Sequence, residues 1–119
     1  MRVDYPAERT VSVWTGTFSS EDEFDRSIDN YVSKRLGLST PIESICEVEF
    51  RPEAVPIREL IEGFSGWETF IDSIVAVAAN HGCNTANAAL VCYYVKCAEA
   101  PTIWGNLHFL GSFPGQDVT

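Results

Sequence analysis

The sequence lacks the features that mark membrane, secreted and nucleic-acid-binding proteins. No apolar run approaches the length of a membrane span, and residues 1–7 are charged, without the apolar core of a signal peptide. Basic residues are scarce, 8 against 17 acidic ones, which gives a net charge of −9. DNA, RNA and anionic membranes attract the opposite charge, so they are disfavoured as partners. We therefore expect a cytoplasmic protein that binds neither nucleic acid nor membrane.

Motifs for phosphate binding and nucleophilic catalysis are also missing. No glycine-rich loop leads into a helix with a basic residue in support, and no Gly-x-Ser-x-Gly elbow occurs. The segment NHGCN places His81 near Cys83, but neighbours in sequence rarely face each other as a nucleophile and its base do. Glu47 and Glu49 share a face of a predicted strand, where a solvated surface is favoured over a glycosidase-like acid pair. We predict that the chain is not an enzyme.

Cysteine and histidine are few, and their spacing fits no metal site. The intervals Cys-x8-Cys and Cys-x4-Cys match no zinc finger or ribbon. In a cytoplasmic chain with many apolar residues, buried free thiols are favoured over disulfides. We therefore expect no metal, no cofactor and free cysteines. The residues concerned are Cys46, Cys83, Cys92, Cys97, His81 and His108.

Hydrophobic periodicity and breaker residues predict the helices and strands. Ser20 with Glu23, and Ser65 with Glu68, have the spacing of capping boxes that begin two helices. Gly37 follows the first helical pattern as its stop. Strands are predicted over 10–15, 45–50, 88–96 and 106–113, and helices over 20–36, 56–62 and 65–81.

These elements, in the order β-α-β-α-α-β-β, predict an α+β fold. The length suits one domain, residues 1–119, with two layers: a roughly four-stranded, mostly antiparallel sheet packed by two main helices. Residues 88–96 are apolar at both alternating sets of positions, so this strand is predicted at the centre, in a hairpin with 106–113. Gly111 is expected at a bulge. Trp14 is expected in the core at a strand end rather than on a partner surface.

Several segments, taken together, resemble a family of bacterial immunity proteins. Residues 14–16 form a Trp-x-Gly at the end of the first strand, which leads into an acid-rich helix that closes with an aromatic residue. An acidic strand, CEVEF, follows, and residues 63–70 open a later helix with the pattern Gly-Phe-Ser and a phenylalanine. The order and spacing of these pieces, from about Val11 to the apolar strand that ends at Val95, resemble the type 22 immunity proteins of polymorphic toxin systems.

The resemblance implies a protein that binds and neutralises a cognate toxin, often a nuclease, with no catalysis and no cofactor. The composition agrees, because nuclease sites are basic and an acidic protein can occlude them. Residues 36–72 hold eight acids against two bases and carry −6 of the net charge. We predict that five acids of this segment contact the toxin: Glu47, Glu49, Glu53, Glu68 and Asp72.

Other interpretations stay open from the sequence. The acids can serve solubility alone, in a small acidic soluble domain that binds a small ligand or self-associates, with no toxin partner. Such a domain would use aromatic residues such as Tyr93, Tyr94 and Trp104. An enzyme that uses the carboxylates is a weaker alternative. No oligomeric state is predicted.

Overall fold

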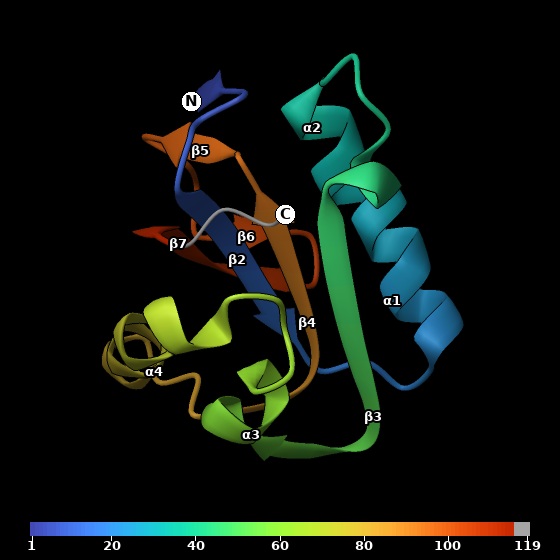
Figure 1. The fold of residues 1–119 in the computed structure, drawn as a ribbon. Helices are drawn as coiled ribbons and strands as arrows, with labels where there is room; N and C mark the ends of the chain where they lie inside the picture. The colour runs from blue at the N-terminus through green and yellow to red at the C-terminus, as the bar shows by residue number, and fades with distance from the viewer. Residues whose placement is uncertain (116–119) are drawn as a thin grey trace.

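The computed structural model describes residues 1–115, and its centre is a five-stranded sheet in the order β3-β4-β2-β7-β6 (Figure 1). Each pair of neighbouring strands is antiparallel. The strands are β2 (Thr10–Gly16), β3 (Cys46–Pro56), β4 (Thr85–Tyr93), β6 (Ile103–Trp104) and β7 (Leu107–Pro114). Two short strands, β1 (Arg2–Asp4) and β5 (Lys96–Ala98), pair with each other. The predicted α+β fold with a mostly antiparallel sheet is confirmed.

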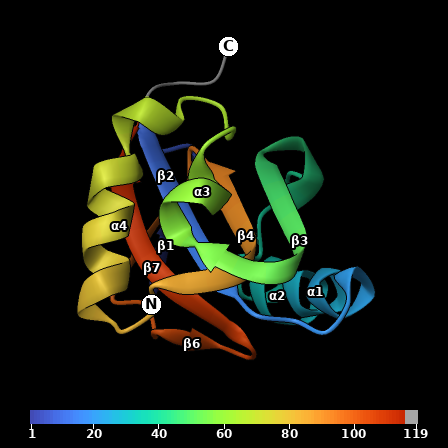
Figure 2. The ribbon, with the colours of Figure 1, turned by 90° about the horizontal axis from the view of Figure 1, so that it is seen from below.

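Helical segments pack against this sheet, as Figures 1 and 2 show. One core cluster joins the sheet to α3 (Ile57–Ile61) and α4 (Ile71–Asn80), which follows the 3₁₀ turn η3 (Trp67–Thr69). A second cluster joins it to α1 (Glu21–Ser27), the π-helical turn η1 (Ile28–Ser33) and α2 (Lys34–Leu36). A 3₁₀ turn, η2 (Ile42–Ser44), leads into β3. Within residues 1–115, no helix is both long and apolar enough to cross a membrane.

The helix after β2 begins as its sequence predicts. Ser20 Oγ accepts a hydrogen bond from the backbone N–H of Glu23 (3.2 Å), and three acidic residues occupy the first turn, at the positive end of the helix dipole. Asn87 of β4 fixes the preceding turn, because its side chain accepts from the Phe18 N–H (2.9 Å) and donates to the Phe18 carbonyl (2.7 Å). These contacts fix where α1 starts relative to the sheet.

The same helical segment contains a π-helical turn that the sequence did not predict. Its buried apolar side chains recur every four residues, at Phe24, Ile28, Val32 and Leu36. This interval exceeds the α-helical period of about 3.6 residues, so the wider turn η1 keeps all of them facing the sheet. Tyr31, in the same turn, is 40% exposed, and its ring lies where a Cβ at Gly105 would be. Gly37 (φ 59°) ends the segment as predicted.

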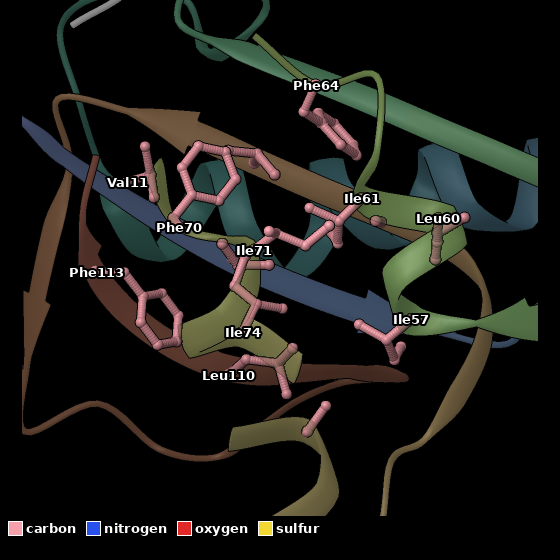
Figure 3. Packing of buried hydrophobic residues seen from close by; sticks show 14 of the residues in the cluster. Val11, Ile57, Leu60, Ile61, Phe64, Phe70, Ile71, Ile74, Leu110 and Phe113 are labelled. Carbon is pink, nitrogen blue, oxygen red and sulfur yellow. The ribbon is translucent and has the colours of Figure 1, made fainter. Parts of the chain in front are cut away.

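Strand β2 contributes side chains to both core clusters. Val11 and Val13 enter the cluster beneath α3 and α4, part of which Figure 3 shows. Trp14 points the opposite way and is fully buried, because alternate residues of a strand face opposite sides of its sheet. The Trp14 ring centroid lies 5.2 Å from that of Trp104 and 4.9 Å from that of Phe109. The predicted core position of Trp14 is therefore confirmed.

Strand β7 contains a bulge at the predicted Gly111. Gly111 and Phe109 pair with consecutive residues of β2, so Leu110 is the extra residue. Gly111 has a φ of 136°, a conformation that favours glycine. Before the bulge, Phe109 faces the cluster that contains Trp14, whereas Leu110 and Phe113 face the cluster beneath α4 (Figure 3).

The predicted hairpin between the last two long strands is wrong. β4 and β7 both pair with β2, which lies between them. Residues 11–15 of β2 are all buried. The backbone N–H and C=O groups of such a strand find hydrogen-bond partners when another strand lies at each of its edges. β3 lies at an edge of the sheet and continues beyond residue 50, the predicted end of the strand, past Pro52 to Pro56. Its pairing with β4 is irregular between Phe50 and Val55. Pro52, which has no backbone N–H, is tolerated in this irregular stretch.

The predicted capping box at Ser65 is also wrong. The helical region begins with η3 at Trp67, and no side chain caps either η3 or α4. The Ser65 hydroxyl instead donates to the Glu47 carboxylate of β3 (2.7 Å), 18 residues away in sequence. A charged acceptor thus replaces the local backbone as the partner of this serine.

Cys46 and Cys92 form a disulfide, contrary to the expectation of free cysteines. They are opposite each other on β3 and β4, with Cα atoms 4.2 Å apart. The Tyr93 N–H donates to the Ile45 carbonyl (2.8 Å), so the cysteines occupy the adjacent non-hydrogen-bonded pair, where opposite residues come closest. The other two cysteines are free.

Candidate functional site

Within residues 1–115, no strand lies beside the outer edge of β3. Because Ile45 turns its carbonyl toward β4, the backbone groups of Cys46, Val48 and Phe50 point away from β4. Val48 is in the middle of this edge and is 55% exposed. Open strand edges are sites where other chains dock.

A hollow of about 440 Å³ lies on one side of this edge, next to α1 and η1. Its apolar lining is formed by Ile28, Ile42, Val48 and Leu90, and its acidic lining by Asp25, Asp29 and Glu43. Asp25 and Asp29 are four residues apart on the helical segment, a spacing at which like charges repel. Within residues 1–115, none of the three carboxylates takes part in an ion pair. The hollow therefore combines apolar surface with unneutralised negative charge.

A second hollow, of about 350 Å³, lies next to the loop after α3. Glu47, Val48 and Glu49 line it from β3, together with Gly63 and Phe64 from the loop. Val48 is thus shared by both hollows, with carboxylates on each side of it. We call the exposed part of this surface the β3 edge site: Asp25, Asp29, Glu43, Val48 and Glu49.

Glu47 itself is held by the protein interior. Its carboxylate accepts hydrogen bonds from the Ser65 N–H (2.8 Å), the Ser65 hydroxyl (2.7 Å) and the Tyr93 hydroxyl (2.8 Å). Burial alone would raise the pKa of Glu47, but these hydrogen bonds outweigh it and leave the pKa below its usual value. Burial and the nearby Glu47 carboxylate raise the pKa of Tyr93 well above its usual value. Glu47 therefore has a structural role. Its contact with a toxin stays a prediction.

The other acids predicted to contact a toxin lie at the surface, with different degrees of neutralisation. Arg51 Nε lies 3.7 Å from Glu49, and Arg58 Nη2 lies 2.8 Å from Asp72. Exposed pairs of this kind are worth only about 0–1 kcal/mol, so they leave the carboxylates accessible. Glu53 on β3 and Glu68 in η3 are exposed, without an ion pair among the residues that the structure describes.

Two features of the β3 edge site escaped the sequence-based prediction. Asp25 and Asp29 were interpreted only as part of an acid-rich helix, and the repulsion between two carboxylates four residues apart does not by itself mark a site. Glu43 lies in the connection before β3, and nothing in the sequence places that connection against α1. The aromatic residues considered for ligand binding are less available: Tyr93 and Trp104 are buried, and Tyr94 is partly buried.

Chemically, this arrangement suits a cationic side chain with an apolar stem. Lysine and arginine bury their methylene groups along apolar surface and keep the charged end beside carboxylates. Among residues 1–115, no group of three or more histidine, cysteine or acidic side chains is placed to hold a metal ion. The hollows thus offer negative charge that can attract a cation and apolar surface on which the stem of a side chain can pack.

Comparison with known proteins found no match to a protein-family model, to a curated protein or to a solved structure.

Proposed function

We propose that this chain is an immunity protein that binds a basic toxin domain in a stoichiometric complex and occludes its active site. The observation that carries the proposal is the β3 edge site, where four carboxylates, three of them without an ion pair among the described residues, surround an exposed apolar residue on an open strand. The order of segments that resembles the type 22 immunity proteins supports it. So does the net charge of −9, which favours a basic partner.

Binding would proceed in two stages. Opposite charges attract over about 8 Å at physiological salt, which speeds encounter and orients the toxin. Lysine or arginine side chains of the toxin then enter the hollow beside α1, with their stems on Ile28 and Val48 and their charged ends near Asp25 and Asp29. A nuclease depends on such basic residues to hold phosphate, so their capture blocks the substrate. This mechanism requires no bond making and no cofactor.

The direct test is co-purification with the product of the adjacent gene. An immunity gene is expected immediately downstream of its toxin gene, so the chain should be co-expressed with the C-terminal domain encoded upstream. We expect a 1:1 complex at low salt that weakens at high salt, because charge drives the association. Absence of a complex at both salt concentrations would overturn the proposed function.

A charge-matched pair of variants tests the location of the site. D25K/D29K reverses two carboxylates of the β3 edge site, and E8K/E99K reverses two exposed acids that follow β1 and β5. Both change the net charge equally, so long-range effects cancel. We expect D25K/D29K to slow toxin association roughly tenfold relative to E8K/E99K in surface plasmon resonance. Equal rates would place the toxin contact elsewhere while leaving the immunity function intact.

The second candidate function is small-ligand binding, which the size of the larger hollow favours. Its volume of about 440 Å³ falls within the range of small-molecule sites, about 300–1,000 Å³. The acidic rim would select a cationic ligand, such as a polyamine. Isothermal titration calorimetry with spermidine separates the two candidate functions. Saturable binding to the wild type that is lost in D25K/D29K would support small-ligand binding in place of toxin binding.

A further inference from the structure

Three side chains from two distant parts of the chain meet in a hydrogen-bonded row. His81 lies at the end of α4, Cys83 follows it in the connection to β4, and His108 belongs to β7. Cys83 Sγ is 3.5 Å from His108 Nδ1, and His108 Nε2 is 2.9 Å from His81 Nδ1. The rings of the two histidines have centroids 5.0 Å apart. The topology thus supplies the long-range partner that the local segment NHGCN lacked.

The contacts define a direction for proton transfer. The Cys83 thiol has two acceptors in reach, His108 Nδ1 at 3.5 Å and the His81 carbonyl at 3.6 Å, and imidazole is the stronger base. When His108 carries its hydrogen on Nε2 and donates it to His81 Nδ1, the lone pair of Nδ1 faces the sulfur. Burial, and secondly the charge of His81, lowers the pKa of His108, which keeps its ring neutral and able to accept a proton at neutral pH.

We propose that Cys83 is a nucleophilic thiol, with His108 as its general base and His81 as a positioning residue, and that it exchanges with small-molecule disulfides. Nucleophile, base and orienting group in a row follow the logic of cysteine–histidine catalytic sites. Cys83 is partly exposed, and a small disulfide can therefore approach it. This site is separate from the β3 edge site and does not depend on the immunity function.

The exchange step balances without another reagent. The Cys83 sulfur attacks one sulfur of the disulfide RS–SR while its hydrogen passes to His108 Nδ1. The S–S bond of the reagent breaks, and a new S–S bond joins Cys83 to one RS group. His108 then returns the proton to the departing RS⁻, which leaves as RSH. The product is a chain that carries a mixed disulfide at Cys83.

Cys97 is the natural comparison within the same molecule. It is also free but only 8% exposed, and burial raises the pKa of its thiol to about 11. No histidine contacts it among the described residues; its neighbours include the Ser12 hydroxyl. Thiols of this kind are inert because the thiolate is the reactive form. We expect Cys97 to react far more slowly than Cys83.

The experiment uses dithiodipyridine, a small neutral disulfide whose released thiopyridone is followed by absorbance. The folded wild-type chain should show one fast thiol, and mass spectrometry of the quenched protein should locate it at Cys83 rather than Cys97; a Cys97→Ala background then isolates the rate of Cys83. Replacing His108 by Gln should slow this reaction about tenfold or more, since a general base is lost. A folded H108Q variant that reacts at the wild-type rate would overturn the proposal.

His81 provides a test that does not disturb a strand. H81Q retains a side-chain acceptor for the Nε2–H of His108, whereas H81L does not. We expect H81Q to keep the wild-type rate within about twofold and H81L to lose about fivefold, a rescue that a merely structural role would not give. Equal rates in the two variants refute the positioning role. Reaction of folded Cys83 no faster than in the urea-unfolded chain refutes the site as a whole.

Discussion

Replacing Glu47 by Ala tests whether this glutamate holds the loop after α3 onto the sheet. The change removes the acceptor of three hydrogen bonds, two of them from Ser65. The Tyr93 hydroxyl also lies 2.8 Å from the Ser65 carbonyl, so it can turn to that oxygen and keep a partner. The net loss is therefore the two bonds from Ser65 to a charged group, worth about 1.5 kcal/mol each at partial burial. We expect the free energy of unfolding to fall by about 2–3 kcal/mol.

Glu49→Ala is the matched control. Glu49 lies two residues along β3 and lines the same hollow, but its only ion-pair contact within residues 1–115 is to Arg51 at 3.7 Å. The cost of placing Ala in a strand is common to both variants and cancels in the comparison. We expect E49A to change stability by less than about 1 kcal/mol. Urea unfolding followed by tryptophan fluorescence gives both free energies, and equal values for the two variants would refute the role of Glu47.

The pH dependence of stability tests the role of Glu47 independently. Because the folded pKa of Glu47 lies below its usual value of 4.5, the carboxylate stabilises the fold above that pH. Its contribution is lost as the pH falls through the lowered folded pKa, where the unfolded chain is already protonated. The stability difference between wild type and E47A should therefore be constant near neutral pH and shrink in acid. A difference that grows in acid contradicts the hydrogen-bonded carboxylate.

Substitutions at two places probe the disulfide and the core. Replacing Cys46 and Cys92 by Ala removes a crosslink between residues 46 apart in sequence, which should lower the free energy of unfolding by about 2–4 kcal/mol. Reductant should destabilise the wild type but not the variant, and equal sensitivity of the two would contradict the disulfide. Trp14→Ala should lower it by about 3–5 kcal/mol, because a fully buried indole leaves a cavity. Trp14→Phe should cost clearly less, since the indole N–H has no hydrogen-bond partner among the described residues; equal losses would contradict this packing.

The parts of the fold that follow from local patterns were predictable from the sequence. Ser20 and Glu23 start α1 as expected, because the capping contact spans three residues and needs nothing from the rest of the chain. The strand predicted over residues 88–96 is covered on both faces as expected, although β4 ends at Tyr93 and lies next to the central strand β2 rather than at the centre. Gly111 marked its bulge through its own backbone preference.

The remaining features depend on contacts between distant segments. The same capping pattern occurs at Ser65, but its hydroxyl donates to the Glu47 carboxylate of β3, and the helical region begins at Trp67 without a side-chain cap. The position of β2 between β4 and β7 fixes which residues meet, and no local pattern encodes it. For the same reason, Asp25 and Asp29 could be recognised as part of a site only when η2 and β3 were seen beside them.

The bulge at Gly111 shifts by one residue the alternation of β7 side chains between the two faces of the sheet. Upstream, odd-numbered residues such as Leu107 and Phe109 face the cluster that contains Trp14; downstream, the odd-numbered Phe113 faces the cluster beneath α4. Deleting Leu110, the extra residue, would restore regular alternation and leave Phe113 opposite Val11, whereas deleting Ser112 would place Phe113 opposite Ser12 and turn it toward the wrong face. A deletion at the bulge therefore removes one side chain from the core, whereas a deletion after it turns the following side chains of β7 to the opposite face of the sheet.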